Sequence, residues 1–262
     1  MLRYAALATL LLTTAAHGGE TLSGHADFYF GRAWLGEGSG TIWSAGGVGR
    51  VNLAFDQRWN GEAEIFADRL FNDEGNLMAF GGAAHLYWRD PASFAAGAFV
   101  SVNGLWGNGE HFATHWRMGP QAQLYTDRAT FYGQVWYGQE HGVGIPDPMT
   151  EWGARAMVRT FVTDNLRLDA ELTYVDINDS FVDAAGVIGA VQVNYRFTDQ
   201  PWTLFVRYQI DHPLEDATFV GDLHRVHLGA RWSFGGSTLK DDDRNGATME
   251  APTRIIHFFA RS

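Results

Sequence analysis

Apolar and polar side chains alternate along most of the chain. In residues 166–176 (LRLDAELTYVD), leucine, alanine and tyrosine alternate with arginine, aspartate, glutamate and threonine. A period of two residues is typical of a β-strand with one apolar and one polar face. A soluble β-sandwich produces this pattern with its apolar face towards a core. A membrane barrel inverts it, with the apolar face towards lipid and the polar face towards the lumen.

The same alternation recurs from residue 24 onward and predicts an all-β chain of about twelve strands. Short segments rich in Asp, Asn and Pro separate some of these strands, and such residues favour tight turns. The expected strands lie near residues 26–34, 51–55, 61–67, 84–88, 94–102, 116–124, 131–137, 152–162, 166–174, 187–197, 202–210 and 226–234.

The connections between the expected strands alternate in length. FDQRWN, RDPAS, TDRA, VTDN and FTDQPW are short, whereas GEGSGTIW, FNDEGN, LWGNGEH, GQEHGVGIPDPM, INDSFVDAAG and DHPLEDATFVGD are longer. An antiparallel up-and-down meander places all odd connections at one end and all even ones at the other. Membrane barrels have short turns at one end and long loops at the other, so the pattern favours a transmembrane barrel.

Tryptophan positions support the same interpretation. Trp prefers the membrane interface, where its ring is half apolar and its N–H reaches water. Two aromatic girdles are therefore expected, one beside the short connections at Trp59, Trp88, Trp202 and Trp232, and one beside the long ones at Trp34, Trp43, Trp106 and Trp152.

The N-terminus indicates export. Arg3 precedes an apolar run that gives way to small residues, which is the layout of a secretory signal. The run is shorter than the roughly 20 residues that a helix needs to cross a bilayer. We expect a signal peptide over residues 1–18, cleaved near Ala16 or Gly18.

Composition narrows the classes of function. A net charge of -11 offers no basic stripe for nucleic acid, and the absence of Cys excludes disulfides and thiolate chemistry. No motif indicates a cofactor or a metal.

Over residues of about 24 to 234, the chain resembles the bacterial outer-membrane β-barrel superfamily, which includes the porins. Members commonly end in a strand whose last residue is aromatic, and VHLGARWSF ends at Phe234. The resemblance implies a barrel over residues 19–234 in the cell outer membrane, with lipid and the barrel-insertion machinery as partners. Residues 235–262 depart from the pattern, and three alternatives stay open for them: a periplasmic tail, a plug, or the true closing strand.

Residue parity predicts which charged side chains face the lumen. Two charged walls are expected to face each other, and they either pair and fill the lumen or border a narrow aqueous passage. Replacing Arg155 and Arg159 with Glu should then change ion selectivity. The acidic wall comprises Asp27, Asp56, Glu62, Glu64 and Asp68; the basic wall comprises Arg155, Arg159, Arg167, Arg196, Arg207, Arg225 and Arg231.

Catalysis is not expected. A hydrolase needs a nucleophile, a base and an orienting group, and the predicted lipid face carries almost no Ser or His. His85, His115 and His227 are predicted to face the lumen as ordinary polar groups, so no catalytic residue is assigned.

The sequence therefore favours a porin-like channel for small hydrophilic solutes. The alternatives are a closed structural or adhesive barrel and, third, an outer-membrane enzyme that modifies lipids.

Overall fold

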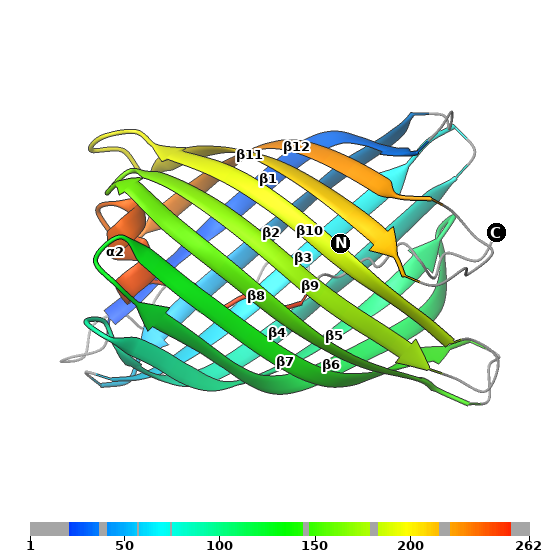
Figure 1. The fold of residues 1–262 in the computed structure, drawn as a ribbon, viewed down its shortest axis with the longest axis horizontal. Coiled ribbons are helices and arrows are strands. Elements are labelled where there is room, and N and C mark those ends of the chain that lie inside the picture. Colours follow the sequence, from blue (N-terminus) through cyan, green and yellow to red (C-terminus); the bar gives the residue numbers. More distant parts are fainter. Residues whose placement is uncertain are drawn as a thin grey trace, which may run out of the picture.

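Twelve antiparallel strands form a closed barrel in the computed structural model of the chain (Figure 1). The structure describes residues 21–36, 41–56, 58–73, 75–143, 147–178, 183–214 and 221–252. The predicted signal peptide lies outside these residues, as do residues 253–262. The strands are β1 (Thr21–Leu35), β2 (Ile42–Ala54), β3 (Trp59–Phe71), β4 (Asn76–Asp90), β5 (Phe94–Gly107), β6 (Glu110–Tyr125), β7 (Ala129–Gly142), β8 (Met149–Thr163), β9 (Leu166–Asn178), β10 (Asp183–Arg196), β11 (Trp202–Pro213) and β12 (Leu223–Phe234).

Each strand pairs with its neighbours in sequence, and β1 pairs with β12 to close the barrel. Phe234, the last residue of β12, lies opposite Gly24 of β1. The predicted up-and-down antiparallel barrel of about twelve strands is confirmed. Because β12 closes the ladder at Phe234, the described residues after it, 235–252, are not the closing strand.

The strand faces follow the predicted parity. Large apolar side chains cover the outside, with Ile65 66% exposed and Leu228 63% exposed, whereas polar and charged residues of the same strands are buried inside. A soluble protein would bury those apolar side chains, so the outer surface is suited to lipid. Among the described residues, no helix is long and apolar enough to cross a bilayer.

The connections differ from the prediction in one respect. LWGNGEH was expected to be a long loop, but β5 continues to Gly107 and β6 begins at Glu110. Asn108 and Gly109 alone join them, with φ angles of 50° and 89°. A two-residue hairpin turn needs positive φ at both positions, and an Asn-Gly pair adopts it at little cost. This prediction was wrong because the Asn-Gly turn signal inside the segment was not recognised.

The two ends of the barrel carry different connections. At the short-turn end, β2 meets β3, β4 meets β5, β6 meets β7, β8 meets β9 and β10 meets β11; the long-loop end is the opposite one. The chain after β12 forms a helix, α2 (Leu239–Asn245), which lies at the short-turn end (Figure 1). Arg244 of α2 donates to the backbone oxygen of Thr126 at 2.7 Å, and the N–H of Lys240 donates to the oxygen of Asp164 at 3.1 Å.

Candidate functional site in the lumen

The interior of the barrel changes character along its axis. Two apolar clusters lie towards the long-loop end. One is built on Ala33, Leu70, Ala79 and Leu223, and the other on Phe99, Trp136, Val175 and Ile177. Buried charges lie along the whole lumen, including the long-loop end, where Arg117 pairs with Glu151 at 2.7 Å. Sequence parity predicted which residues point inward but not these clusters.

Most predicted charged residues line the lumen, but Asp56 does not. It lies in the exposed turn between β2 and β3, where its carboxylate accepts the N–H groups of Arg58 at 2.6 Å and Trp59 at 2.7 Å. These hydrogen bonds lower its pKa. The assignment of Asp56 to the acidic wall was therefore wrong, because β2 ends at Ala54 and strand parity does not extend into the turn.

The lumen charges form local ion pairs rather than two facing walls of opposite sign. Adjacent inward positions can reach one another, and buried charges require partners. Arg167 pairs with Asp169 on its own strand at 2.8 Å, and Arg225 pairs with Asp211 on the neighbouring strand. The closest atoms lie 2.7 Å apart in Arg231–Asp27, 2.6 Å in Arg50–Glu64, 2.9 Å in Arg155–Glu171 and 2.9 Å in Arg207–Glu171.

The C-terminal segment, residues 235–252, includes α2, and the part after α2 runs inside the barrel. The carbonyl oxygen of Gly246 accepts from Arg89 at 2.8 Å, and that of Thr248 accepts from Gln123 at 3.2 Å. Glu62 accepts the N–H groups of Thr248 at 3.1 Å and Met249 at 3.3 Å. The lumen wall therefore satisfies the backbone of this segment from several strands, as a peptide-binding groove does.

Met249 is fully buried in the lumen. Its cluster includes Tyr87, Tyr125, Tyr132 and Met157, which come from β4, β6, β7 and β8. This apolar contact lies in the sequence between Asp243 and Glu250, two acidic residues that pair with lumen arginines.

Glu250 is held by arginines from opposite parts of the wall. Its carboxylate accepts from Arg155 at 2.7 Å and from Arg159 at 2.9 Å, both on β8, and lies 3.7 Å from Arg50 on β2. Burial opposes ionisation, but Arg155, Arg50 and Arg159 together hold the pKa of Glu250 well below its usual range.

Two aspartates of α2 are bound in the same way. Asp243 accepts from Arg159 at 2.9 Å and from Thr130 at 2.5 Å, and Asp242 accepts from Arg196 at 2.6 Å. Burial opposes the ionisation of Asp243, but Arg159 and Arg167 keep its pKa below the usual value. For Asp242, burial outweighs Arg196 and Arg231, and its pKa is raised.

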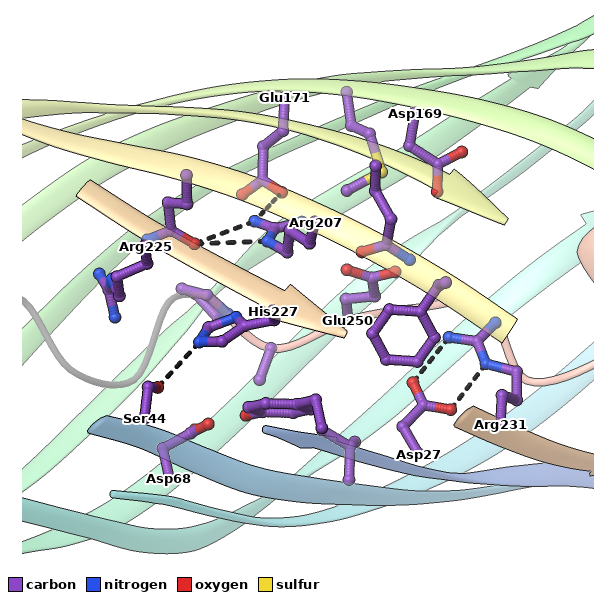
Figure 2. A pocket seen from close by; sticks show the side chains of 18 of the residues that line it. Asp27, Ser44, Asp68, Asp169, Glu171, Arg207, Arg225, His227, Arg231 and Glu250 are labelled. Carbon is purple, nitrogen blue, oxygen red and sulfur yellow. Dashed lines mark hydrogen bonds and ion pairs between the residues drawn. The ribbon is translucent and has the colours of Figure 1, made fainter. Parts of the chain in front are cut away.

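A cavity of about 150 Å³ remains beside the C-terminal segment (Figure 2). It is bordered by β1, β2, β3 and β8 to β12, with Glu250, Ala251 and Pro252 on the side of the C-terminal segment. Its charged side chains are Asp27, Arg50, Asp68, Arg69, Arg155, Arg167, Asp169, Glu171, Arg207, Arg225, Arg231 and Glu250. Arginines outnumber carboxylates in this set. Arg207, whose side chain is 20% exposed, is more exposed than Arg50, Arg155, Arg167, Arg225 and Arg231.

The three predicted inward histidines lie in separate places. His85 interacts with Gln121 at 3.2 Å, His115 lies 3.0 Å from Glu151, and His227 lies 2.8 Å from Ser44. The Ser44–His227 pair (Figure 2) borders the cavity, but the described residues place no carboxylate in hydrogen-bond contact with His227, and arginines lie nearby. It therefore lacks the orienting acid of a hydrolase triad. The described residues also contain no group of three or more His, Asp or Glu side chains placed to hold a metal ion.

The residues that sequence reasoning missed are those that bind the C-terminal segment. Arg50 and Arg89 lie on β2 and β4 but were not among the predicted wall residues, and Asp243 and Glu250 follow the last strand, where alternation no longer applies. An available signal was the run of three aspartates, Asp241 to Asp243, after Phe234, opposite a lumen rich in arginine.

No protein-family model matches the chain, and no curated protein sequence matches it. Solved structures do. The COG4313 outer membrane channel from Pseudomonas putida F1 aligns with a TM-score of 0.58 at 16% identity, over 84% of this chain and 97% of that one. The KdgM porin in complex with disordered oligogalacturonate aligns with a TM-score of 0.52 at 11% identity, over 80% of this chain and 99% of that one. At such identities the likeness shows the fold.

Proposed function

From the fold of a bacterial outer-membrane β-barrel, we propose that this protein is a porin-like channel of the outer membrane for small hydrophilic solutes. The observation that carries the proposal is the cavity lined by arginines and carboxylates, which continues the lumen beside the C-terminal segment. Charged groups along a passage select solutes by sign and size. The titles of the two similar structures name a channel and a porin, which supports the same class.

The cavity limits the size of the solute. A cavity of about 150 Å³ beside the C-terminal segment leaves only part of the lumen free. Apolar clusters narrow the lumen towards the long-loop end. The described conformation therefore fits a channel that is nearly closed and passes small solutes at a low rate. Lipid and the barrel-insertion machinery, which would read the strand ending at Phe234, belong to the same proposal.

A closed structural or adhesive barrel is the second candidate. The observation that favours it is the filled lumen, where Arg117, Arg159, Glu64 and Glu151 are almost completely buried. The two functions differ in whether water and ions cross the barrel, so conductance separates them directly. An enzymatic role finds no support in the Ser44–His227 pair.

The test is single-channel conductance in planar bilayers, with folding checked by heat-modifiable gel migration. Three chains are compared: the full chain, a chain truncated after Pro252 and a chain truncated after Gly236. The channel proposal predicts small steps for the first two and larger steps for the third, because the third lacks the segment that occupies the lumen. Replacing Arg207 with Gln should shift selectivity towards cations. Folded, inserted chains that never conduct, including the one truncated after Gly236, would establish the closed barrel instead.

A further inference from the structure

Three arginines converge on one carboxylate in the lumen. Arg155 and Arg159 donate to different oxygens of Glu250, and Arg50 approaches from the facing strand β2. Such convergence gives both charge and direction, because the planar guanidinium groups orient a carboxylate through fixed N–H vectors. We call Arg50, Arg155 and Arg159 the arginine cluster.

The arginine cluster borders the cavity through two of its members. Arg50, Arg155 and Glu250 line the cavity. The Glu250 carboxylate therefore lies at the boundary between the C-terminal segment and the remaining passage (Figure 2). A solute in the cavity could therefore approach the site that Glu250 occupies. The wall carboxylates Glu64 and Glu171 pair with Arg50 and Arg155, and Arg155 Nη2 donates to both Glu171 and Glu250.

Loss of Glu250 from the site would leave a concentrated positive charge. Arg159 is almost fully buried, and its partners are Asp243 and Glu250, both from the C-terminal segment. Buried, unpaired guanidinium groups are unfavourable, so the empty cluster would take up an anion. A carboxylate is the anion whose geometry the cluster already accommodates.

We propose that the arginine cluster is a binding site for carboxylate solutes and that Glu250 occupies it as an internal ligand, so that a carboxylate solute displaces the C-terminal segment. The inference rests on the proposed function in treating the lumen as the route of a solute. Its chemistry, however, is exchange of one carboxylate for another at the same guanidinium groups, and this exchange can be measured without conduction.

Displacement would release more than one contact. The carbonyl of Thr248 and the carboxylate of Glu250 share the same Arg159 nitrogen, and the carbonyl of Glu250 accepts from Gln134 at 3.0 Å. Movement of Glu250 therefore weakens the backbone contacts beside it. Residues near Thr248 should become accessible to water when a carboxylate solute occupies the cluster.

The experiment measures thiol accessibility in the full chain. The chain has no cysteine, so Ala247→Cys places one thiol in the buried part of the C-terminal segment. The labelling rate with an uncharged maleimide is measured in detergent micelles at neutral pH, with citrate as the carboxylate probe. Sodium chloride at matched ionic strength and sucrose are the comparison solutes. Ala92→Cys, in an exposed turn, reports any effect of the solutes on the reagent itself.

Citrate should raise the labelling rate of the Ala247→Cys chain several-fold over the labelling rate in sodium chloride. Adding Glu250→Gln should raise the rate without citrate by about tenfold or more, which is the factor expected for loss of a charge-assisted hydrogen bond. Glu110→Gln, at the exposed start of β6, is the matched control for loss of one glutamate charge.

Equal rates in citrate and sodium chloride for the otherwise unaltered chain would overturn the inference, even if Glu250→Gln failed to fold. A citrate effect in a chain that never conducts would support the arginine cluster while contradicting the channel. Conduction without a citrate effect would do the opposite, so the two proposals fail separately.

Discussion

Arg159 and Glu250 are 91 residues apart in the sequence, and their Nη2 and Oε1 atoms lie 2.9 Å apart inside the barrel. Through its Nη1 atom, the same guanidinium also holds Asp243 at 2.9 Å. One side chain of β8 thus ties the helix and the extended part of the C-terminal segment to the wall.

Replacing Arg159 with Met should detach the C-terminal segment while the barrel stays folded. Removing one partner of a buried ion pair costs about 3–5 kcal/mol when the other charge stays buried. Here Asp243 and Glu250 can regain water by leaving the lumen, so the cost should appear as lost docking. Limited trypsin digestion measures this, since Lys240 and Arg244 lie in α2.

Arg128→Met is the matched control, because Arg128 lies exposed in the turn between β6 and β7. Unchanged protection of Lys240 and Arg244 in the Arg159→Met chain would show that Arg159 does not anchor the segment.

Replacing Met249 with Ala should weaken docking through packing alone. Met249 is fully buried among Tyr87, Tyr125 and Tyr132, and truncation of such a side chain costs about 2–5 kcal/mol. Amide hydrogen exchange should therefore quicken at Thr248, Met249 and Ala251, whose N–H groups donate to Glu62 and Glu64. Met118→Ala on the outer face should leave these amides unchanged.

The contribution of Glu250 and Asp243 to docking should be constant between about pH 8 and 5 and should weaken as the pH falls below about 4. The pKa of Glu250 is held well below its usual range by Arg155, Arg50 and Arg159 against burial, so its contribution is present above the ordinary pKa and is lost as the pH falls towards the depressed one. Asp243, also depressed, acts in the same direction.

Two other groups near the C-terminal segment bear on this pH dependence. Asp242 has a raised pKa and opposes the trend, and Tyr132 donates its hydroxyl to the Glu250 carbonyl at any pH in this window. Exchange protection factors at Ala251, which follows Glu250 and donates its N–H to Glu64, are measured from pH 7 to pH 3 and compared with those of the Glu250→Gln chain. A loss of protection centred above pH 5 would contradict the expectation.

Replacing Ile65 with Arg should destabilise the barrel in a bilayer. Ile65 lies on the outer face of β3 and is 66% exposed, and an arginine on the lipid face costs about 2–4 kcal/mol at the bilayer midplane. Urea unfolding in phospholipid vesicles, followed by tryptophan fluorescence, gives the change in the free energy of unfolding. Val143→Arg, equally exposed but in the connection after β7, should cost much less. Equal costs would show that Ile65 does not contact lipid.

Alternation predicted the barrel because each strand reports its own two faces. Arg155 and Glu64, for example, lie inside because their positions on β8 and β3 leave no other side. Parity could not predict partners, since Arg155 pairs with Glu171 on the next strand and with Glu250 beyond the last one. Asp56 was wrongly assigned to the lumen because it lies in the turn after β2, where hydrogen bonds to backbone N–H groups, and not strand alternation, set the side-chain direction.

The C-terminal segment was beyond sequence reasoning for a physical reason. Its conformation is not set by local pattern, because its partners Arg50, Glu62, Arg89, Gln123 and Arg159 come from strands spread over most of the chain. Only the closed barrel brings these side chains within reach of one short peptide.

The placement of these partners also sets an order of assembly. Since the groups that hold Thr248 and Glu250 come from β2, β3, β4, β6, β7 and β8, no subset of early strands offers the complete site. The closing β1–β12 ladder ends at Phe234, before the C-terminal segment begins, so the barrel can close with that segment still outside. The C-terminal segment can therefore dock after the barrel has closed, and its docking requires β2, β3, β4, β6, β7 and β8 to have reached their native register.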